Sequence, residues 1–212
     1  MTQEVNPSIK KRNKFYGLLI IAAIVLPMLL AYLIFTTGIG FPSGTTNKGQ
    51  LLIPPQPIQN LSLISDSDVL SLLYSDNSST DKPVVKKRWR LLVPVTKNCN
   101  EQCQGYLYLT RQVHIRLAEK AYRVERMLLL LDTFSEAEKE TLKQEHPETL
   151  FVESTPQNLQ EWLAQATLPL APNNFFYLVD QEGFAMMRYD ESHSGQDLLD
   201  DIKKLLKFTY DK

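Results

Sequence analysis

The feature that most constrains this chain is an uncharged apolar segment near its start. Residues 15–35 contain no Asp, Glu, Lys or Arg and consist mostly of Leu, Ile, Val, Ala and Phe. As an α-helix with a rise of about 1.5 Å per residue, this segment is roughly 30 Å long, which matches the hydrocarbon core of a bilayer. Pro27 lies inside it, and transmembrane helices tolerate such a proline. The sequence therefore predicts an N-terminal transmembrane helix.

Basic residues gather on one side of this segment, at Lys10, Lys11, Arg12 and Lys14. On the other side, no Lys or Arg occurs before Lys48. Because basic flanks stay in the cytoplasm, we expect residues 1–14 to be cytoplasmic and the part after residue 35 to be exported. A cleaved signal peptide fits less well, since its apolar region is usually about 7–15 residues long and ends at a small-residue cleavage site.

The charge of the exported part excludes one class of partner. The whole chain has a formal net charge of −1, and its first 14 residues carry four basic side chains and one acidic side chain. The rest therefore carries 19 basic and 23 acidic side chains, a net charge of −4. It shows no basic patch interleaved with aromatic residues, so we expect no binding to nucleic acid.

Glycine and proline are concentrated just after the apolar segment, at Gly38, Gly40, Pro42, Gly44, Gly49, Pro54, Pro55 and Pro57. We therefore predict that residues 36–86 comprise a stalk, which holds the domain away from the membrane and is stiffened where two prolines adjoin, and an edge segment whose structure the sequence leaves open. In the edge segment, residues 59–86 alternate short apolar clusters with Ser and Asp. This pattern fits either a hairpin or a loop packed on the edge of the domain.

Residues 87–212 show the periodicities of an α/β domain. The predicted order is strand, helix, strand, helix, a helical insert, two strands and a helix: 89–95, 101–122, 127–131, a helix capped by Ser135, a helix starting at Thr155-Pro156, 175–179, 184–189 and a helix capped by Ser194. A strand–helix–strand unit followed by a hairpin and a helix is typical of a thioredoxin-like domain, which has a central mixed sheet flanked by helices.

Cys99 and Cys103 are the two cysteines of the chain, and they lie where the first strand turns into the first helix. The unpaired N–H groups and the positive dipole of a helix N-terminus favour thiolate, so we expect the pKa of Cys99 to lie below that of a free thiol. A spacing of four residues places both sulfur atoms on one face of the first turn. From there they can form a disulfide or bind Cu(I), which prefers soft sulfur donors.

Two other interpretations of the pair stay open. A structural disulfide between Cys99 and Cys103 would close a loop of five residues, for which chain entropy predicts about 2 kcal/mol of stabilisation, against about 4.7 kcal/mol for a loop of a hundred residues. In that case the domain would be a non-catalytic docking factor. The sequence Thr96-Lys97-Asn98-Cys99 also has the T-x-x-C pattern of peroxiredoxins, although the proline expected four residues before the threonine is missing.

A single N-terminal anchor, a Gly/Pro-rich stalk and a thioredoxin-like domain with C-x-x-x-C resemble the Sco/SenC family. The resemblance covers residues 15–35 and 85–212, and the stretch 47–55 is similar to a small Sco-related group of anchored proteins associated with bacterial oxidase genes. It implies a single-pass protein of the bacterial inner membrane, with its C-terminal domain in the periplasm. It also implies a role in cytochrome c oxidase assembly.

On this resemblance, Cys99 and Cys103 are the redox thiols or the Cu(I) ligands. The implied partner is either cytochrome c oxidase subunit II or another assembly factor. Subunit II would receive copper from the pair, or the pair would keep the cysteines of its copper site reduced. Sco proteins that bind copper use a histidine as third ligand before the final hairpin, but residues 170–174 hold none.

Another histidine could take the place of the missing ligand. His114 lies eleven residues past Cys103, about 16 Å along one helix, which is too far. His146 follows the second helix and is expected on the surface. His193 lies in the 190–194 loop, which this topology places near the cysteines, so it is the candidate third donor.

We predict that an alkaline phosphatase fused to the C-terminus is active and that a cytoplasmic fluorescent reporter at the same position is dark. The physical reason is the excess of Lys and Arg before residue 15, which retains the N-terminus in the cytoplasm. Enzyme activity and fluorescence in intact cells measure the two fusions. A fluorescent C-terminal fusion would show the opposite orientation.

Overall fold

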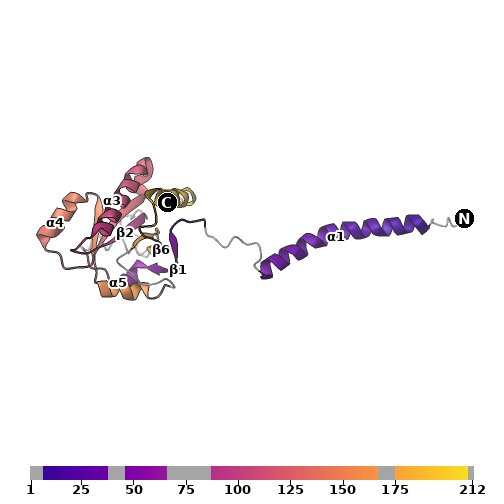
Figure 1. Ribbon diagram of the computed structural model, residues 1–212, viewed down its shortest axis with the longest axis horizontal. Helices are drawn as coiled ribbons and strands as arrows, with labels where there is room; N and C mark the ends of the chain where they lie inside the picture. The colour runs from indigo at the N-terminus through magenta and orange to yellow at the C-terminus, as the bar shows by residue number, and fades with distance from the viewer. Residues whose placement is uncertain (1–6, 38–45, 66–86, 167–174, 210–212) are drawn as a thin grey trace, which may run out of the picture. The chain divides into compact units, whose positions relative to one another are not determined.

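The computed structural model describes residues 7–37, 46–65, 87–166 and 175–209. The chain forms two compact units, residues 1–46 and residues 47–212. The first unit contains helix α1 (Pro7–Thr37), drawn in indigo in Figure 1. Within the described residues, the section Phe15–Thr37 of this helix is long and apolar enough to cross a membrane. This agrees with the span predicted from the sequence at residues 15–35.

The second unit is built on a six-stranded mixed sheet with the order β1-β6-β5-β2-β3-β4. Its strands are β1 (Gln50–Pro57), β2 (Trp89–Val95), β3 (Val124–Leu130), β4 (Thr149–Glu153), β5 (Phe176–Val179) and β6 (Phe184–Tyr189). Strands β2, β3 and β4 are parallel to one another, whereas β5, β6 and β1 join by antiparallel pairing. A mixed sheet of this order confirms the predicted thioredoxin-like architecture.

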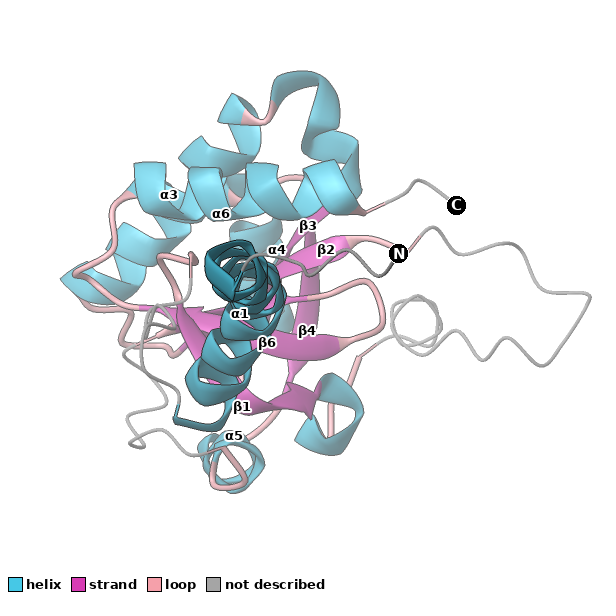
Figure 2. Ribbon diagram, turned by 90° about the vertical axis from the view of Figure 1, so that its right-hand side faces the viewer, coloured by secondary structure: helices cyan, strands magenta, loops and turns pink. Residues whose placement is uncertain are grey.

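Helices cover both faces of the sheet. Beyond α1 they are α3 (Glu101–Arg116), α4 (Glu136–Glu145), α5 (Pro156–Leu163) and α6 (Gly195–Phe208), with short 3-10 turns η1 (Ile58–Leu61) and η2 (Ala118–Arg123). Figure 2 shows α3 and α6 together on one face of the sheet and α5 on the other. Two apolar clusters fill these layers, one beneath α3 and α6 and one beneath α5 and η1.

The helix starts follow the capping residues seen in the sequence. The side chains of Ser135 and Ser194 each form a capping box, with Glu138 and with Asp197 respectively. The Thr155 hydroxyl accepts the N–H of Asn158 at the start of α5. These bonds satisfy backbone N–H groups that have no partner inside the helix, which is why the predicted starts are correct.

Helix α3 is shorter than the predicted 101–122, because the chain turns at Ala118, whose φ is +49°. The 3-10 turn η2 follows, and the imidazole of His114 bridges the carbonyl oxygens of Ala121 and Val124 through Nε2, at 3.2 and 2.9 Å. His114 therefore stabilises the connection from α3 to β3.

Residues 50–61 belong to the domain, whereas the sequence placed the chain up to Pro57 in the stalk and left residues 59–86 open as a hairpin or an edge loop. Strand β1 forms the edge of the sheet beside β6, and Ile58 and Leu61 of η1 are fully buried. Pro54 and Pro55 made this strand hard to predict from the sequence. Proline has no N–H to donate to the hydrogen bonds of a β-sheet, so within sheets it is confined to edge strands and irregular positions. The pairing register indeed shifts between Leu51 and Gln56.

The structure also contains β4, which the predicted element order lacks. Only three apolar residues, Leu150, Phe151 and Val152, mark this strand, and it forms the other edge of the sheet. So short a run does not distinguish a strand from a loop. Beyond η1, Ile64 forms an isolated bridge with Glu153, so the chain packs on the domain edge there. Residues 66–86, for which a hairpin was the alternative, lie outside the described residues.

A buried carboxylate joins the start of β1 to the last helix. Asp201 of α6 is only 2% exposed. Its Oδ2 accepts the N–H groups of Lys48 at 2.9 Å and Gly49 at 2.8 Å, together with the hydroxyl of Tyr189 at 3.0 Å. Three donors satisfy the buried charge, as burial of a carboxylate requires. Asp201 thus attaches the segment that leaves the first unit to the core of the domain.

We predict that Gly49→Ala destabilises the domain by about 1–3 kcal/mol, the usual cost of overpacking a core. A Cβ at residue 49 would lie 2.5 Å from the ring of Tyr189, which is itself held by the buried Asp201. The measurement is the denaturant midpoint of the full chain in detergent.

Gly105→Ala in α3 is the matched control, because a Cβ there meets no atom within 4 Å. Alanine is the better helix former, so this control should be stabilised by about 0.5–1 kcal/mol. Equal midpoints for the two variants would contradict the tight contact at residue 49.

Candidate thiol-disulfide site

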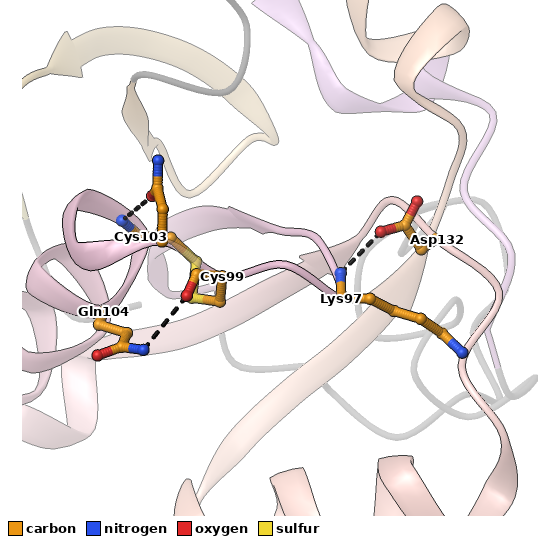
Figure 3. The surroundings of a disulfide bond; sticks show 6 residues. Lys97, Cys99, Cys103, Gln104 and Asp132 are labelled. Atoms are coloured by element: carbon orange, nitrogen blue, oxygen red, sulfur yellow. Dashed lines mark hydrogen bonds between the residues drawn. A yellow bond between two sulfur atoms is a disulfide. The ribbon is translucent and has the colours of Figure 1, made fainter.

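Cys99 and Cys103 form a disulfide at the point where β2 turns into α3, with their Cα atoms 5.2 Å apart (Figure 3). Strand β2 ends at Val95, and residues 96–100 form the turn. The sequence predicted both cysteines in this turn and on one face of the first helical turn. The structure brings the two residues together as expected.

The helix start orients the two sulfur-bearing residues differently. Asn100 is the N-cap of α3, and its Oδ1 accepts the N–H of Cys103 at 2.9 Å. Cys103 therefore lies inside the first turn, is 8% exposed and packs in the core cluster beneath α3. Cys99 precedes the cap and is half-buried. Of the two sulfur atoms, that of Cys99 belongs to the more accessible residue.

Hydrogen bonds on both sides of Cys99 hold the turn. The Cys99 carbonyl accepts Nε2 of Gln104 at 3.2 Å. The N–H of Lys97 donates to Oδ2 of Asp132, which follows β3, at 2.7 Å (Figure 3). These bonds tie the cysteine turn to its own helix and to the neighbouring parallel strand.

Lys97 also brings a positive charge to the turn. Its Nζ lies 3.1 Å from Oε2 of Glu138 and 5.8 Å from the centre of the Phe134 ring. The pKa of Glu138 is lowered to about 2, first by the backbone N–H of Ser135 and then by the Ser135 hydroxyl and Lys97. The carboxylate stays ionised, so the first turn of α4 holds the Lys97 side chain by charge.

Tyr106 lies one helical turn beyond Cys103 and is buried. Its hydroxyl accepts Nε2 of Gln102 at 2.9 Å. The pKa of Tyr106 is raised to about 12, mainly by burial and also by the charges of Asp190 and Glu191. The loop after β6 therefore acts electrostatically on Tyr106 of α3.

His193, the candidate third metal donor, is engaged elsewhere. Its Nδ1 lies 2.7 Å from Oδ1 of Asp190, and its Nε2 lies 3.1 Å from the carbonyl oxygen of Lys48. Its ring also packs edge-on against Tyr189. The part of the chain that the structure describes contains no group of three or more His, Cys, Asp or Glu that could hold a metal ion. His193 is therefore not assembled with the cysteines here.

Three other positions were considered as the source of a third metal ligand: His114, His146 and residues 170–174. His114 binds two backbone carbonyls, as described above. His146 was expected on the surface, but it is half-buried at the end of α4. Residues 170–174, the segment that holds no histidine in the sequence, lie outside the described residues.

Sequence reasoning did not identify Asn100, Lys97 and Asp132 as parts of the site. Asn100 carried a signal, because Asn before a helix is a frequent cap. The Lys97–Asp132 bond joins residues 35 positions apart, so only the pairing of β2 with β3 brings them together.

The fold and the site define a thioredoxin-like domain with a C-x-x-x-C disulfide, preceded by an apolar helix. Residues 89–209 match the family described as "Transmembrane-like, thioredoxin-like, C-terminal domain". This match covers more than half of the chain, so the chain belongs to that family. This match confirms the predicted thioredoxin-like domain, and the apolar section Phe15–Thr37 of α1 fits the predicted membrane span. A comparison with curated protein sequences finds no match.

Several solved structures are similar to this chain at low identity. Yeast Sco1 with copper bound is 18% identical over 58% of this chain and 80% of its own, with a TM-score of 0.48. BsSco, described as a member of the Sco family of cytochrome c oxidase assembly proteins, is 15% identical over 58% and 83%, with a TM-score of 0.43. The thioredoxin domain of a Bacteroides vulgatus thiol-disulfide oxidoreductase is 17% identical over 57% and 80%, with a TM-score of 0.41.

After reduction, we predict that Cys99 reacts with iodoacetamide at least about tenfold faster than Cys103. Cys99 is partly exposed and precedes the helix cap, whereas Cys103 is packed in the core, and thiol reactivity depends on exposure and thiolate character. Mass spectrometry of the folded, reduced protein after short labelling measures the ratio. Equal rates in the folded protein, with the unfolded protein as reference, would contradict this assignment.

Proposed function

We propose that this protein exchanges disulfides with a partner through Cys99 and Cys103, in an exported domain held to the membrane by α1. The observation that carries the proposal is the asymmetric disulfide at the β2–α3 turn, with one half-buried and one buried cysteine. A bridge that closes only a five-residue loop adds little stability, so stability alone gives a weak reason for it.

The exchange starts from the disulfide present in the structure. A partner thiolate attacks the sulfur of Cys99, a mixed disulfide forms, and the Cys99–Cys103 bond breaks with Cys103 leaving as thiolate. The N-terminus of α3 favours an anion in this turn. A second thiolate of the partner then attacks the partner's sulfur atom in the mixed disulfide. This forms a disulfide within the partner and releases Cys99 as a thiolate. The partner has lost two electrons and the pair has gained them.

The same steps in reverse reduce a partner disulfide. Cys99 attacks as the nucleophile, and Cys103, held next to it in the first turn, attacks the Cys99 sulfur and resolves the mixed disulfide. In both directions the more accessible cysteine meets the partner and the buried cysteine reacts only within the chain.

For the partner we propose cytochrome c oxidase subunit II or another factor in oxidase assembly. This assignment is supported by the resemblance of the sequence to the Sco/SenC family, including the stretch 47–55. In this structure that stretch contains Lys48 and Gly49, which bind the buried Asp201. We place the domain in the bacterial periplasm, where disulfides form and persist.

The metal-binding side chains near the pair fit copper handling less well than disulfide exchange. The reduced pair would offer two thiolates, which suit Cu(I). The described residues add no third His, Cys, Asp or Glu to them, and both ring nitrogens of His193 have partners within the domain. The Sco-type site with two cysteines and one histidine is therefore not assembled, and we derive no step through copper.

We predict that a Cys99→Ser, Cys103→Ser strain makes oxidase with little activity and little copper, while Cys103→Ser alone accumulates a mixed disulfide with the partner. The double variant cannot exchange electrons, and the single variant cannot resolve the intermediate formed at Cys99. Oxidase activity, oxidase copper content and non-reducing gels with mass spectrometry are the measurements.

Cys99→Ser alone is the matched control for trapping, because it leaves only the buried sulfur and should trap no partner. Active, copper-loaded oxidase in the double variant would leave only a docking role. A reduction potential below about −300 mV would identify a structural bridge, whereas a less negative value fits an exchanging pair.

A further inference from the structure

Arg126 is a buried arginine whose charge has no partner among the described residues. It lies on β3 and is 4% exposed, and its Nε and Nη2 atoms are buried without a hydrogen-bond partner. Among the described residues no carboxylate forms an ion pair with it. An unpaired buried charge is costly, and each such group requires an explanation.

The other buried arginines of the described residues all have partners. Arg90 donates from Nε to Oε2 of Glu125 at 3.2 Å, and Arg123 donates from both terminal nitrogens to the carbonyls of Leu206 and Thr209. Arg188 donates to Oε1 of Gln50 and stacks on Phe175. Arg123 has one buried nitrogen without a hydrogen-bond partner, Nε, but both of its terminal nitrogens donate to carbonyls. Arg126 differs because two of its buried nitrogens, Nε and Nη2, lack a hydrogen-bond partner.

The surroundings of Arg126 are positive. Its side chain lies on the face of β3 that also carries Val124 and Leu128, beneath α3, because residues alternate along a strand. The pKa of Arg126 is lowered to about 10, first by burial and then by the charge of Arg111, an exposed residue of α3. The charge of Arg111 on α3 therefore acts on the guanidinium of Arg126 on β3.

His146 completes the cluster from a third element. It caps the end of α4 and stands three residues before Thr149, which pairs with Arg126 across β3 and β4. Its Nδ1 is buried without a hydrogen-bond partner. Burial lowers the pKa of His146, and the charges of Arg126 and Arg111 lower it further, while Glu145 acts in the opposite direction. Two neighbouring residues therefore both carry orphaned buried nitrogens.

We propose that Arg126, Arg111 and His146 form a binding site for a small oxyanion such as sulfate or a carboxylate. The planar guanidinium fork of Arg126 matches two oxygens of such an ion, which would satisfy its orphaned N–H groups. Arg111 supplies a second charge at the surface, where an arriving ion meets it first. The buried nitrogens are sealed in this structure, so binding includes a local opening around them.

This site is separate from the redox pair in its residues. The cysteines and their partners lie on the β2–α3 turn, whereas the cluster draws on the middle of α3, on β3 and on the end of α4. Failure of the anion site would therefore leave the proposed thiol exchange intact, and the two proposals can be tested independently.

The test uses the full chain in an uncharged detergent, with sodium sulfate or sodium acetate at millimolar concentration against sodium chloride of equal ionic strength. We expect sulfate to raise the Tm of the domain by at least about 2 °C, because a ligand that binds only the folded state stabilises it. A shift with acetate as well would show that planar carboxylates also enter.

Arg126→Met should abolish the shift while its Tm in chloride does not fall, since the substitution removes an unpaired buried charge. Arg116→Gln is the matched control on α3 and should keep the full shift, because Arg116 is engaged with Gln196 on the α6 side. If Arg126→Met does not fold, the double variant Arg111→Gln, His146→Gln replaces it. The dependence of its Tm on sulfate concentration should give an apparent affinity at least about fivefold lower than that of the unchanged protein.

Equal melting temperatures of the natural protein in all three salts would overturn the proposal. So would an undiminished sulfate shift in Arg126→Met or in the double variant, because that result would mean general salt stabilisation. A shift confined to the natural protein and to Arg116→Gln supports the site.

Discussion

The pairing of β2 on both of its edges is the constraint on which the cysteine site depends. β2 is buried along its whole length, between β5 on one side and β3 on the other. Its end at Val95 is therefore fixed in space, and the following turn can place Cys99 and Asn100 reproducibly. Because β2 and β3 are parallel, both end at the same edge, which brings Asp132 to the backbone of Lys97.

The site combines a rigid helix start with an accessible residue before it. The cap at Asn100 uses its side chain to bind the backbone of Cys103, which leaves this cysteine inside the core. Cys99 lies outside the cap and is held through its carbonyl by Gln104. This division between a buried and an accessible sulfur is what a two-step exchange needs, since only one cysteine has to meet a partner.

Much of the domain could be predicted from local patterns. β2, with its continuous apolar run, was predicted at its observed bounds, and the caps Ser135, Thr155 and Ser194 each begin a helix. β1 and β4 could not be predicted, because both are edge strands with weak sequence patterns. Prolines interrupt β1, and β4 has only three apolar residues. His193 was placed in the correct loop, but its hydrogen bonds to Asp190 and Lys48 direct both ring nitrogens away from a shared metal site.

The sequence by itself determined the apolar anchor, the thioredoxin-like element order and the position of Cys99 and Cys103 at a helix start. These features depend on periodicity and spacing over a few residues. Only the tertiary structure decided that Asp201 binds Lys48, 153 residues away, and that Arg126 is buried without a partner. The physical reason is that a charge or polar group acquires its partner, or lacks one, only when distant elements pack around it.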